Sequence, residues 1–387
     1  MIADSISDLL TLQQVCDLLQ CHPNTLRQWD KRGLLQALRL GARRDRRYKK
    51  EDVLLFLEKN SLAGGIDENP MHRKCAPRFI DLFAGVGGIR LGFERNGGKC
   101  VFTSEWDEAC KDVYEANFGH RPAGDITKLK TEDIPEHDIL VGGFPCQTFS
   151  IIGRRKGFSD TRGTLFFDIE RILRDKRPYA FMLENVRSLV NHDGGRTFAV
   201  ITDCLRSLGY FVHWKVLNGL DFGVPQKRDR TIIVGFRQNH PFEFPTHAET
   251  PTKTLSEILE PDEKVDKKYN LSEKVLNKIH SRVKKSMEGP TIWHENKSGN
   301  IGVHKFSCAL RANGSYNYLT VNGTRRLTPR EMYRLQGFPD SFKIPAVDTQ
   351  ARKQAGNSVV VPKIQAVAKA MMEAMKKSPM PVTNHLV

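Results

Sequence analysis

The chain of 387 residues is long enough for two or three domains, and it contains no stretch near the roughly 20 apolar residues of a membrane span. Its formal net charge of +15 favours a polyanionic partner, with nucleic acid the leading candidate over an unspecialised basic protein. The eight cysteines lack CxxC spacing, so neither a zinc site nor a disulfide framework is indicated, and Asp4 and Asp8 argue against a secretory signal. We expect a cytoplasmic protein without metal or membrane association, in which a free thiol can remain a nucleophile.

Residues 1–60 are predicted to form a small helical unit that binds DNA. An amphipathic helix from Leu12 to Leu19 is followed by a turn and a second helix, which suits helix-turn-helix geometry. The runs Thr25–Trp29, Gly33–Leu34 and Arg47–Tyr48 resemble winged helix-turn-helix domains of the MerR and excisionase type. A protein-interaction or dimerisation unit is the alternative. The residues expected to contact DNA are Arg27 and Gln28 on the second helix and Arg43 and Arg44 in the basic loop 39–50.

After a linker over 61–77, short apolar strands alternate with helices. This alternation predicts a doubly wound α/β fold with a mostly parallel sheet over 78–250. The predicted strands are 79–83, 100–104, 139–141, 180–183 and 231–234, and the predicted helices are 165–173 and 198–208.

Residues 237–321 are polar and irregular, without alternating strands and helices. We expect a smaller irregular domain over 251–340, which includes the run RRLTPRE. The chain then returns to the α/β domain over 341–387 and ends in a helix over 359–375.

The glycine turn Ala84–Gly88 joins the first strand to a helix, as in cradles for nucleotide cofactors. The glycine turn alone is also compatible with a tight packing turn or with a loop that binds a phosphate. After the second strand, Glu105 suits hydrogen bonding to ribose hydroxyls, and Trp106 offers a flat face for an adenine ring. Asp125 is expected where an adenine amino group would need an acceptor.

Cys146 lies in the run GGFPCQTFS, directly after a predicted strand. The strand puts the sulfur at a carboxyl edge of the sheet, where open α/β sheets bind ligands, and Pro145 restricts the backbone beside it. A single cysteine in this position suggests covalent catalysis.

Nine sequence blocks in a fixed order resemble those of bacterial DNA (cytosine-5)-methyltransferases. They are DLFAGVGG, SEWD, GDIT, GGFPCQTFS, RGTLFF, ENV, QKRDR, RRLTPRE with LQGFPDS, and QAGNSVVVP. The resemblance covers residues 78–387 and implies a Rossmann-like methyltransferase domain, a target recognition domain over 251–340, and S-adenosylmethionine as cofactor. The implied cofactor-binding residues are Phe83, Gly85, Gly87, Glu105, Trp106, Asp125, Ile126, Pro145, Leu165, Asn357 and Ser358.

By the same resemblance, the Cys146 thiolate attacks C6 of a cytosine flipped out of duplex DNA, which makes C5 able to take a methyl group. Glu184 would contact cytosine N3 as an acid, with a capping or ion-paired glutamate as the alternative. Arg230 would contact cytosine O2, and Arg228 a phosphate or local structure, with a solvated basic turn as the alternative. These four are the expected catalytic residues.

The chain departs from the family pattern in the target recognition domain. Many relatives carry a Thr-Leu pair where this chain has Cys308–Ala309–Leu310–Arg311, so a hydroxyl is missing. The expected DNA contacts of the catalytic and recognition parts are Gln147, Ser150, Arg154, Arg155, Arg311 and Asn313.

Three functional hypotheses follow. The first is a DNA (cytosine-5)-methyltransferase of a restriction–modification system, with double-stranded DNA as partner and a monomeric catalytic core. The second adds regulation of its own promoter by residues 1–60. The third is methylation of RNA, against which the order of the blocks argues.

Overall fold

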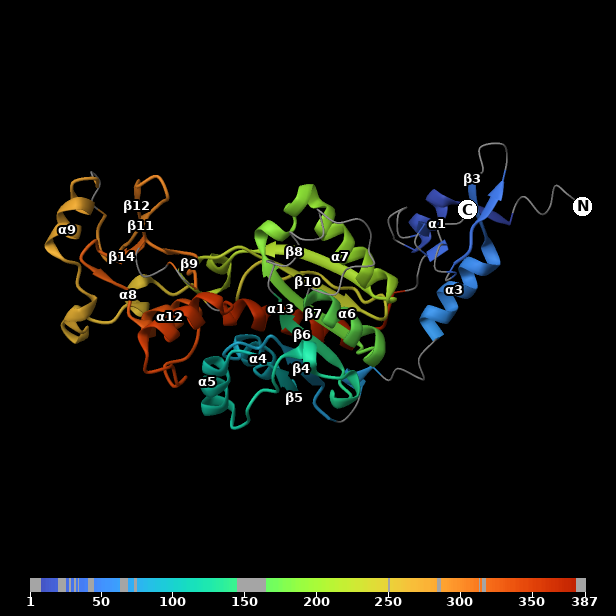
Figure 1. Ribbon diagram of the computed structural model, residues 1–387, viewed down its shortest axis with the longest axis horizontal. Helices are drawn as coiled ribbons and strands as arrows, with labels where there is room; N and C mark the ends of the chain where they lie inside the picture. Colours follow the sequence, from blue (N-terminus) through green and yellow to red (C-terminus); the bar gives the residue numbers. More distant parts are fainter. Residues whose placement is uncertain are drawn as a thin grey trace, which may run out of the picture.

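The computed structural model describes residues 8–19, 26–27, 29–30, 33, 35–40, 45–62, 69–72, 75–144, 165–249, 251–283, 287–312, 314 and 318–380. Figure 1 shows a large central sheet, a small sheet at one end of the long axis, and the N-terminal unit at the other. No helix in these ranges is long and apolar enough to cross a membrane.

The central sheet has six strands in the order β5-β4-β6-β7-β10-β8. They are β4 (Arg78–Leu82), β5 (Lys99–Ser104), β6 (Ile139–Gly143), β7 (Ala180–Val186), β8 (Phe211–Leu217) and β10 (Arg230–Phe236). The four strands from β5 to β7 are parallel, whereas β10 runs antiparallel to both β7 and β8. The sequence did not predict β8, because this edge strand mixes apolar and polar residues and leaves Trp214 partly exposed.

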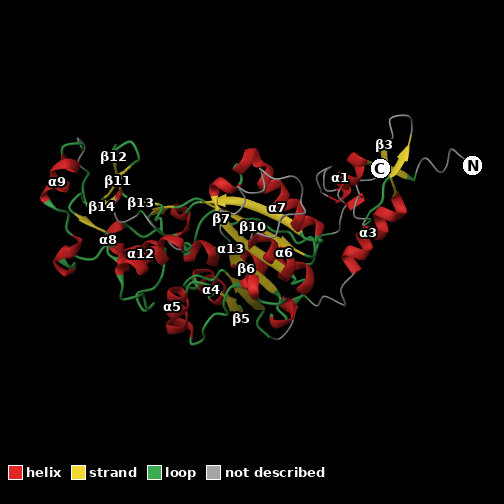
Figure 2. Cartoon of the chain, in the orientation of Figure 1, coloured by secondary structure: helices red, strands yellow, loops and turns green. Residues whose placement is uncertain are grey.

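Helices cover both faces of this sheet, which confirms the doubly wound fold (Figure 2). Neighbouring residues of a strand point to opposite faces, so Phe79 packs under α4 and α13, while Ile80 packs under α6 and α7. The helices are α4 (Gly88–Glu94), α5 (Glu108–Phe118), α6 (Leu165–Lys176), α7 (Arg196–Ser207) and α13 (Val361–Lys376).

The region expected to be irregular contains an ordered antiparallel sheet, so that prediction is wrong. Its strand order is β12-β11-β14-β15. The strands are β11 (Ile292–Glu295), β12 (Ile301–His304), β14 (Leu319–Val321) and β15 (Arg325–Arg326), and the helices are α8 (Leu255–Ile258) and α9 (Glu273–His280). Strands of two to four residues are too short to produce a clear alternating pattern in the sequence.

The small sheet shares its core with the catalytic part. Ile292 and Leu319 belong to the same hydrophobic cluster as Val113 of α5 and Met332 of α11 (Pro329–Leu335). A further connection is the parallel pair of β9 (Gln226–Lys227) and β13 (Ser307–Cys308). The helix α12 (Asp348–Asn357) leads back to α13. The domain boundaries at 250 and 340 stay predictions, because this shared core does not divide at them.

The N-terminal unit combines helices with a three-stranded antiparallel sheet. Its elements are β1 (Leu9–Thr11), α1 (Leu12–Leu19), β2 (Leu38–Leu40), β3 (Asp45–Lys49) and α3 (Lys50–Leu62), with strand order β1-β3-β2. The helix over 12–19 is confirmed. The basic stretch 39–50, expected as a loop, instead supplies β3, part of β2 and the start of α3. Buried Val15, Leu26, Trp29, Tyr48 and Val53 form the core of the unit.

The linker expected over 61–77 is shorter than predicted. The side-chain amide of Asn69 donates to the carbonyl oxygen of Met375, and Met71 packs on the same core cluster as α13. Residues 69–72 therefore dock on the α/β domain. Short 3-10 helices occur at Pro70–His72 (η1), Ile126–Lys128 (η2), Thr131–Asp133 (η3), Arg187–Leu189 (η6), His192–Gly195 (η7), Gly219–Phe222 (η8), Asp262–Lys264 (η9) and Lys267–Tyr269 (η10).

Candidate active site

Strands β6 and β7 end side by side and bring two of the predicted blocks together. Gly143 of β6 is paired with Glu184 of β7. Beyond it, the side-chain amide of Asn185 donates to the carbonyl oxygen of Phe144 at 2.9 Å. The candidate nucleophile follows two residues later. Pro145, Cys146, Gln147, Ser150, Arg154 and Arg155 lie outside the described residues.

Glu184 and Arg230 form an ion pair at this edge of the sheet, with Arg230 Nε 3.0 Å from Glu184 Oε1. Both side chains are largely buried. Glu184 was expected after a strand ending at residue 183, but β7 continues to Val186 and holds Glu184 inside the hydrogen-bonded ladder. A Cβ placed on Gly143 would lie 3.4 Å from Glu184 Oε2, so the carboxylate lies over a residue without a side chain. A carboxylate beside a guanidinium can hydrogen-bond the polar edge of a planar ring.

Arg228 is fully buried, which excludes a solvated basic turn. Its guanidinium donates to the carbonyl oxygens of Leu310 at 2.8 Å, Gly356 at 2.9 Å and Ser358 at 2.5 Å. Through these bonds, Arg228 links Leu310, in the segment between β13 and β14, to the end of α12. Of the two roles expected for Arg228, its contacts match local structure, and they leave its side chain no access to a phosphate.

The glycine turn has the backbone shape that a ligand cradle needs. Phe83, Gly85 and Gly87 all have positive φ angles, of 56°, 54° and 87°. The amide of Gly85 donates to Glu105 Oε2 at 2.8 Å, and the amide of Asp107 donates to Glu105 Oε1 at 2.8 Å. Burial raises the pKa of Glu105, while these amide hydrogen bonds oppose the rise. The buried carboxylate is thereby oriented at the carboxyl end of β5.

Among the other predicted cofactor residues, Ile126 and Leu165 belong to the same hydrophobic cluster as Phe83. Trp106 exposes 71% of its surface, which leaves its ring available for stacking. Asp125 caps η2 and accepts from Thr127. A Cβ on Gly88 would lie 2.8 Å from Ser358 Oγ, so the block around Asn357 packs directly on the turn. Ile126 is buried, Leu165 and Ser358 are half-buried, and Asn357 is exposed.

One face of the small sheet carries polar and aromatic side chains near Arg228. His294 and His304 point to the same face, since they pair with Leu319 and Ile292. The guanidinium of Arg311 lies over the ring of Tyr318, with 4.8 Å between the guanidinium carbon and the ring centroid, and this ring contacts His294 edge-on. Burial lowers the pKa of both histidines; Arg311 lowers that of His294 further, and Lys227 that of His304. Asn313 lies outside the described residues.

These histidines were not predicted, because no spacing in the sequence relates His294 and His304 to the sheet face. Asn185 was part of the ENV block, but its bond to Phe144 required the positions of two strands. At the stretch 308–311, the amide of Leu310 donates to Gln226 Oε1 at 3.1 Å, so the backbone there is anchored without a threonine hydroxyl.

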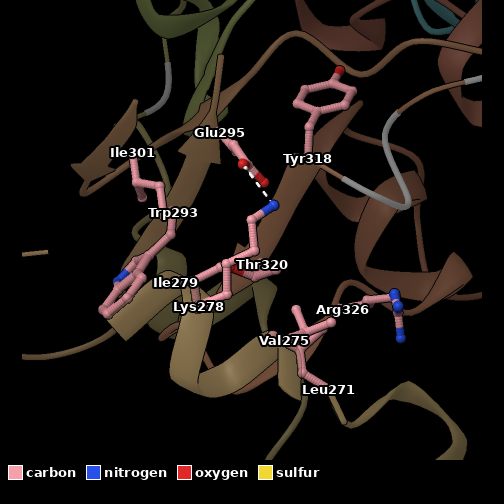
Figure 3. Close-up of a pocket in the computed structure, with 10 residues that line it drawn as sticks. All are labelled: Leu271, Val275, Lys278, Ile279, Trp293, Glu295, Ile301, Tyr318, Thr320 and Arg326. Atoms are coloured by element: carbon pink, nitrogen blue, oxygen red, sulfur yellow. Dashed lines mark hydrogen bonds and ion pairs between the residues drawn. The ribbon is translucent and has the colours of Figure 1, made fainter. Parts of the chain in front are cut away.

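A pocket of about 330 Å³ lies on the opposite face of the small sheet, next to α9 (Figure 3). Trp293 and Thr320, which pair across β11 and β14, line it together with Ile279. Figure 3 shows Lys278 and Glu295 joined as an ion pair, at 3.2 Å, along its wall. Neither Glu184 nor Arg230 lines this pocket.

In the N-terminal unit, one carboxylate connects the hairpin to the helical part. Asp30 accepts hydrogen bonds from Arg39 at 2.9 Å, from Arg46 at 3.1 Å and from the Ala37 amide at 3.0 Å. Arg27 is exposed beside it in sequence, as expected for a DNA contact. Gln28, Arg43 and Arg44 lie outside the described residues.

Comparisons with known proteins agree with this arrangement. Residues 77–373 match the family model of C-5 cytosine-specific DNA methylase, and residues 9–61 match a helix-turn-helix domain model. The chain is 57% identical over 290 residues to the Type II methyltransferase M.NgoBI of Neisseria gonorrhoeae, which covers 75% of this chain and 91% of that relative. It is also 57% identical over 296 residues to M.HaeII of Haemophilus aegyptius, covering 76% and 93%.

Solved structures share the fold at low identity. Entamoeba histolytica methyltransferase EhMeth matches with a TM-score of 0.62 and 18% identity, covering 79% of this chain and all of that one. A putative DNA modification methyltransferase encoded within a prophage of E. coli matches with a TM-score of 0.60 and 21% identity, covering 78% and 100%. These similarities support the Rossmann-like architecture of the α/β domain.

Proposed function

Since the chain belongs to the C-5 cytosine-specific DNA methylase family, as a Type II methyltransferase of the restriction–modification kind, we propose how it acts. It transfers a methyl group from S-adenosylmethionine to C5 of a cytosine flipped out of duplex DNA, through a covalent bond between Cys146 and C6. The observation that carries this proposal is the Glu184–Arg230 pair, which lies at the strand edge where the chain leaves β6 toward Cys146.

The reaction needs an electron-rich C5, which cytosine lacks. The Cys146 thiolate adds to C6, while Glu184 donates a hydrogen bond and proton to N3 and Arg230 hydrogen-bonds O2. Both contacts withdraw electrons from the ring and favour the addition. After C5 has gained the methyl group, the N3 proton returns to Glu184, solvent takes the C5 proton, and the electrons of the C6–S bond return to the Cys146 thiolate as the C5–C6 double bond re-forms.

The donor set of the glycine turn fits S-adenosylmethionine. The oriented Glu105 carboxylate can accept from two ribose hydroxyls, and the exposed Trp106 ring can stack on adenine. Asp125 would accept from the adenine amino group, and Gly85, whose φ is positive, has no Cβ to block the ligand. When bound, this cofactor supplies an electrophilic methyl group. Pro145, Ile126, Leu165 and Asn357 would complete the pocket.

Target DNA would lie against the exposed Arg311 and the half-buried His294 and His304. Arg311 follows Leu310, whose carbonyl accepts from Arg228, so duplex bound there would lie near the segment that carries Arg230. Arginine and imidazole groups can hydrogen-bond base edges in the major groove. Methylation of RNA is disfavoured, because the matched family is one of DNA methylases.

Two measurements test the proposed reaction. The Cys146→Ser variant should lose turnover and should form no covalent complex with a duplex containing 5-fluorocytosine, whereas the wild-type chain should be trapped on it. Bisulfite sequencing of DNA from a host that expresses the chain should reveal 5-methylcytosine in one short sequence. Full activity of the serine variant would refute the covalent step.

The N-terminal unit supports a second function, regulation of its own promoter. It matches a helix-turn-helix model, and its hairpin is joined to the helical part by Asp30. Removal of residues 1–60 should abolish binding to the upstream DNA of its own gene and leave methylation intact. Unchanged promoter binding and expression would exclude this function. The monomeric state of the catalytic core is also a proposal, which the sedimentation coefficient tests.

A further inference from the structure

Lys363 is a buried lysine that has no role in the proposed reaction. It lies in the first turn of α13, and its side chain is fully buried. Its Nζ donates to the carbonyl oxygen of Arg228 at 3.5 Å, a long hydrogen bond. Within the described ranges, no carboxylate lies within ion-pair distance of this amine. An ammonium in such a place is costly, so stability alone does not account for a lysine there.

The acceptor of that bond belongs to the segment that carries Arg230. The Arg228 amide donates to Asn218 Oδ1 at 3.1 Å, and the Arg228 carbonyl also accepts from the Gly219 amide at 3.1 Å. Arg230 follows two residues later and pairs with Glu184. Lys363 therefore contacts the base of the segment that presents Arg230 to the substrate.

Charged groups of the active site act on the Lys363 amine. Burial lowers the pKa of Lys363 to about 7, with Arg230 and Arg228 contributing to the fall and Glu184 and Asp229 opposing it. Asp229 is itself paired with Arg187 at 3.1 Å.

The other elements packed on α13 add little charge. The helix α4 carries Arg90 and Glu94, which pair with each other at 2.7 Å. The charged residue of η8, Asp221, is exposed. The described side chains of η1, Pro70 and Met71, are uncharged. The protonation of Lys363 is thus coupled to the Glu184–Arg230 pair more than to any other group around it.

We propose that Lys363 is a positioning residue for Glu184 and Arg230, and that its amine must be uncharged for the enzyme to turn over. The neutral amine holds the Arg228 carbonyl. A proton on it would add a second cation behind Arg230 and hinder proton donation from Glu184 to cytosine N3. This inference rests on the proposed function of Glu184.

The test compares the pH dependence of kcat/KM for the full-length wild-type chain and Lys363→Met, which removes the amine and keeps the length of the side chain. Tritiated methyl transfer from S-adenosylmethionine to unmethylated plasmid DNA is measured between pH 6 and pH 8. The ratio of wild-type to variant kcat/KM cancels the titration of Cys146 and of the substrates. We expect this ratio to rise about tenfold over this range, as for one group that titrates near pH 7, and the change to appear in kcat and not in KM for DNA.

The matched control is Lys376→Met, the same substitution at an exposed position in the last turn of α13, which should keep the wild-type pH profile. Lys363→Gln retains a donor for the Arg228 carbonyl and cannot gain a proton, so it replaces the methionine variant if that variant does not fold. A ratio independent of pH would overturn the role of Lys363. Absence of methyl transfer by the wild-type chain would instead overturn the proposed function.

Discussion

The side-chain amide of Asn185 donates to the carbonyl oxygen of Phe144 at 2.9 Å, in a buried position between the ends of β7 and β6. Because Phe144 precedes Pro145 and Cys146 in the sequence, this bond fixes the backbone two residues before the proposed nucleophile. The Oδ1 atom of Asn185 accepts from the Val186 amide at 2.8 Å, which holds the side chain in this orientation. One residue before, Glu184 is paired with Gly143 of β6.

Asn185→Ala should lower kcat by about ten- to a hundredfold, because an unpaired buried carbonyl costs about 1–3 kcal/mol and the loop would lose its anchor. Binding of S-adenosylmethionine should change less than twofold. Single-turnover methylation and calorimetric titration of the cofactor separate the two effects. If the variant methylated DNA at the wild-type rate, the bond would be irrelevant to the position of Cys146.

Glu184→Gln keeps the shape of the side chain and an acceptor for Arg230, but removes the acid. We expect kcat to fall by about 10²–10³-fold, within the range of a general acid, with little change in DNA affinity. The exposed Glu263→Gln is the matched control and should be fully active. Equal kcat values for Glu184→Gln and the wild-type chain would argue that Glu184 only pairs with Arg230.

Glu105→Ala should weaken binding of S-adenosylmethionine by about ten- to a hundredfold, since the loss of acceptors for the ribose and for the Gly85 amide costs about 1–3 kcal/mol. Isothermal titration calorimetry measures this directly. Glu132→Gln, on the exposed side of η3, should bind the cofactor normally. If Glu105→Ala bound S-adenosylmethionine with unaltered affinity, the cofactor would not bind at the end of β5.

Glu331→Ala should destabilise the region that joins the small sheet to α11. The Arg325 guanidinium lies 2.9 Å from Glu331 Oε1, and both side chains are almost completely buried. Removal of the Glu331 carboxylate leaves the buried Arg325 with the exposed Asp262 as its remaining carboxylate partner among the described residues, and should cost at most about 3–5 kcal/mol. Chemical denaturation should detect this loss, whereas Asp340→Asn, at an exposed ion pair with Arg334, should cost less than about 1 kcal/mol. Similar midpoints for the two variants would contradict the prediction.

Stability should also depend on pH through Lys363. The pKa of this amine is about 7 in the folded chain, below its usual value of 10.5, so the unfolded chain binds more protons between these values. Stability of the wild-type chain therefore gains a contribution as pH rises from about 7 to about 10.5. Lys363→Met lacks this contribution. Its melting temperature should exceed that of the wild-type chain at pH 7, and the difference should narrow toward pH 10; a constant difference would show that Lys363 titrates normally.

Most strands and helices of the α/β domain, but not β8 or α5, could be predicted from residues 78–236, because these elements carry their own periodicity and the glycine turn has its own backbone preference. The positions of Glu105 and Trp106 at the end of β5, where we propose that the cofactor binds, could be predicted for the same reason, since they directly follow a strand in the sequence. The antiparallel direction of β10 could not be predicted, because the direction of a strand depends on its pairing with distant strands, here β7 and β8.

The sequence by itself determined the order of the family blocks, the glycine turn and the apolar strands, because these depend on neighbouring residues. Only the tertiary structure decided which distant side chains meet. Glu184 pairs with Arg230, and Arg228 is buried against the carbonyls of residues 310, 356 and 358, because the sheet brings these separate segments together. Nothing in the local sequence distinguishes Lys363 from a surface lysine. Its burial follows from the packing of α13 on the sheet, which a local sequence pattern cannot predict.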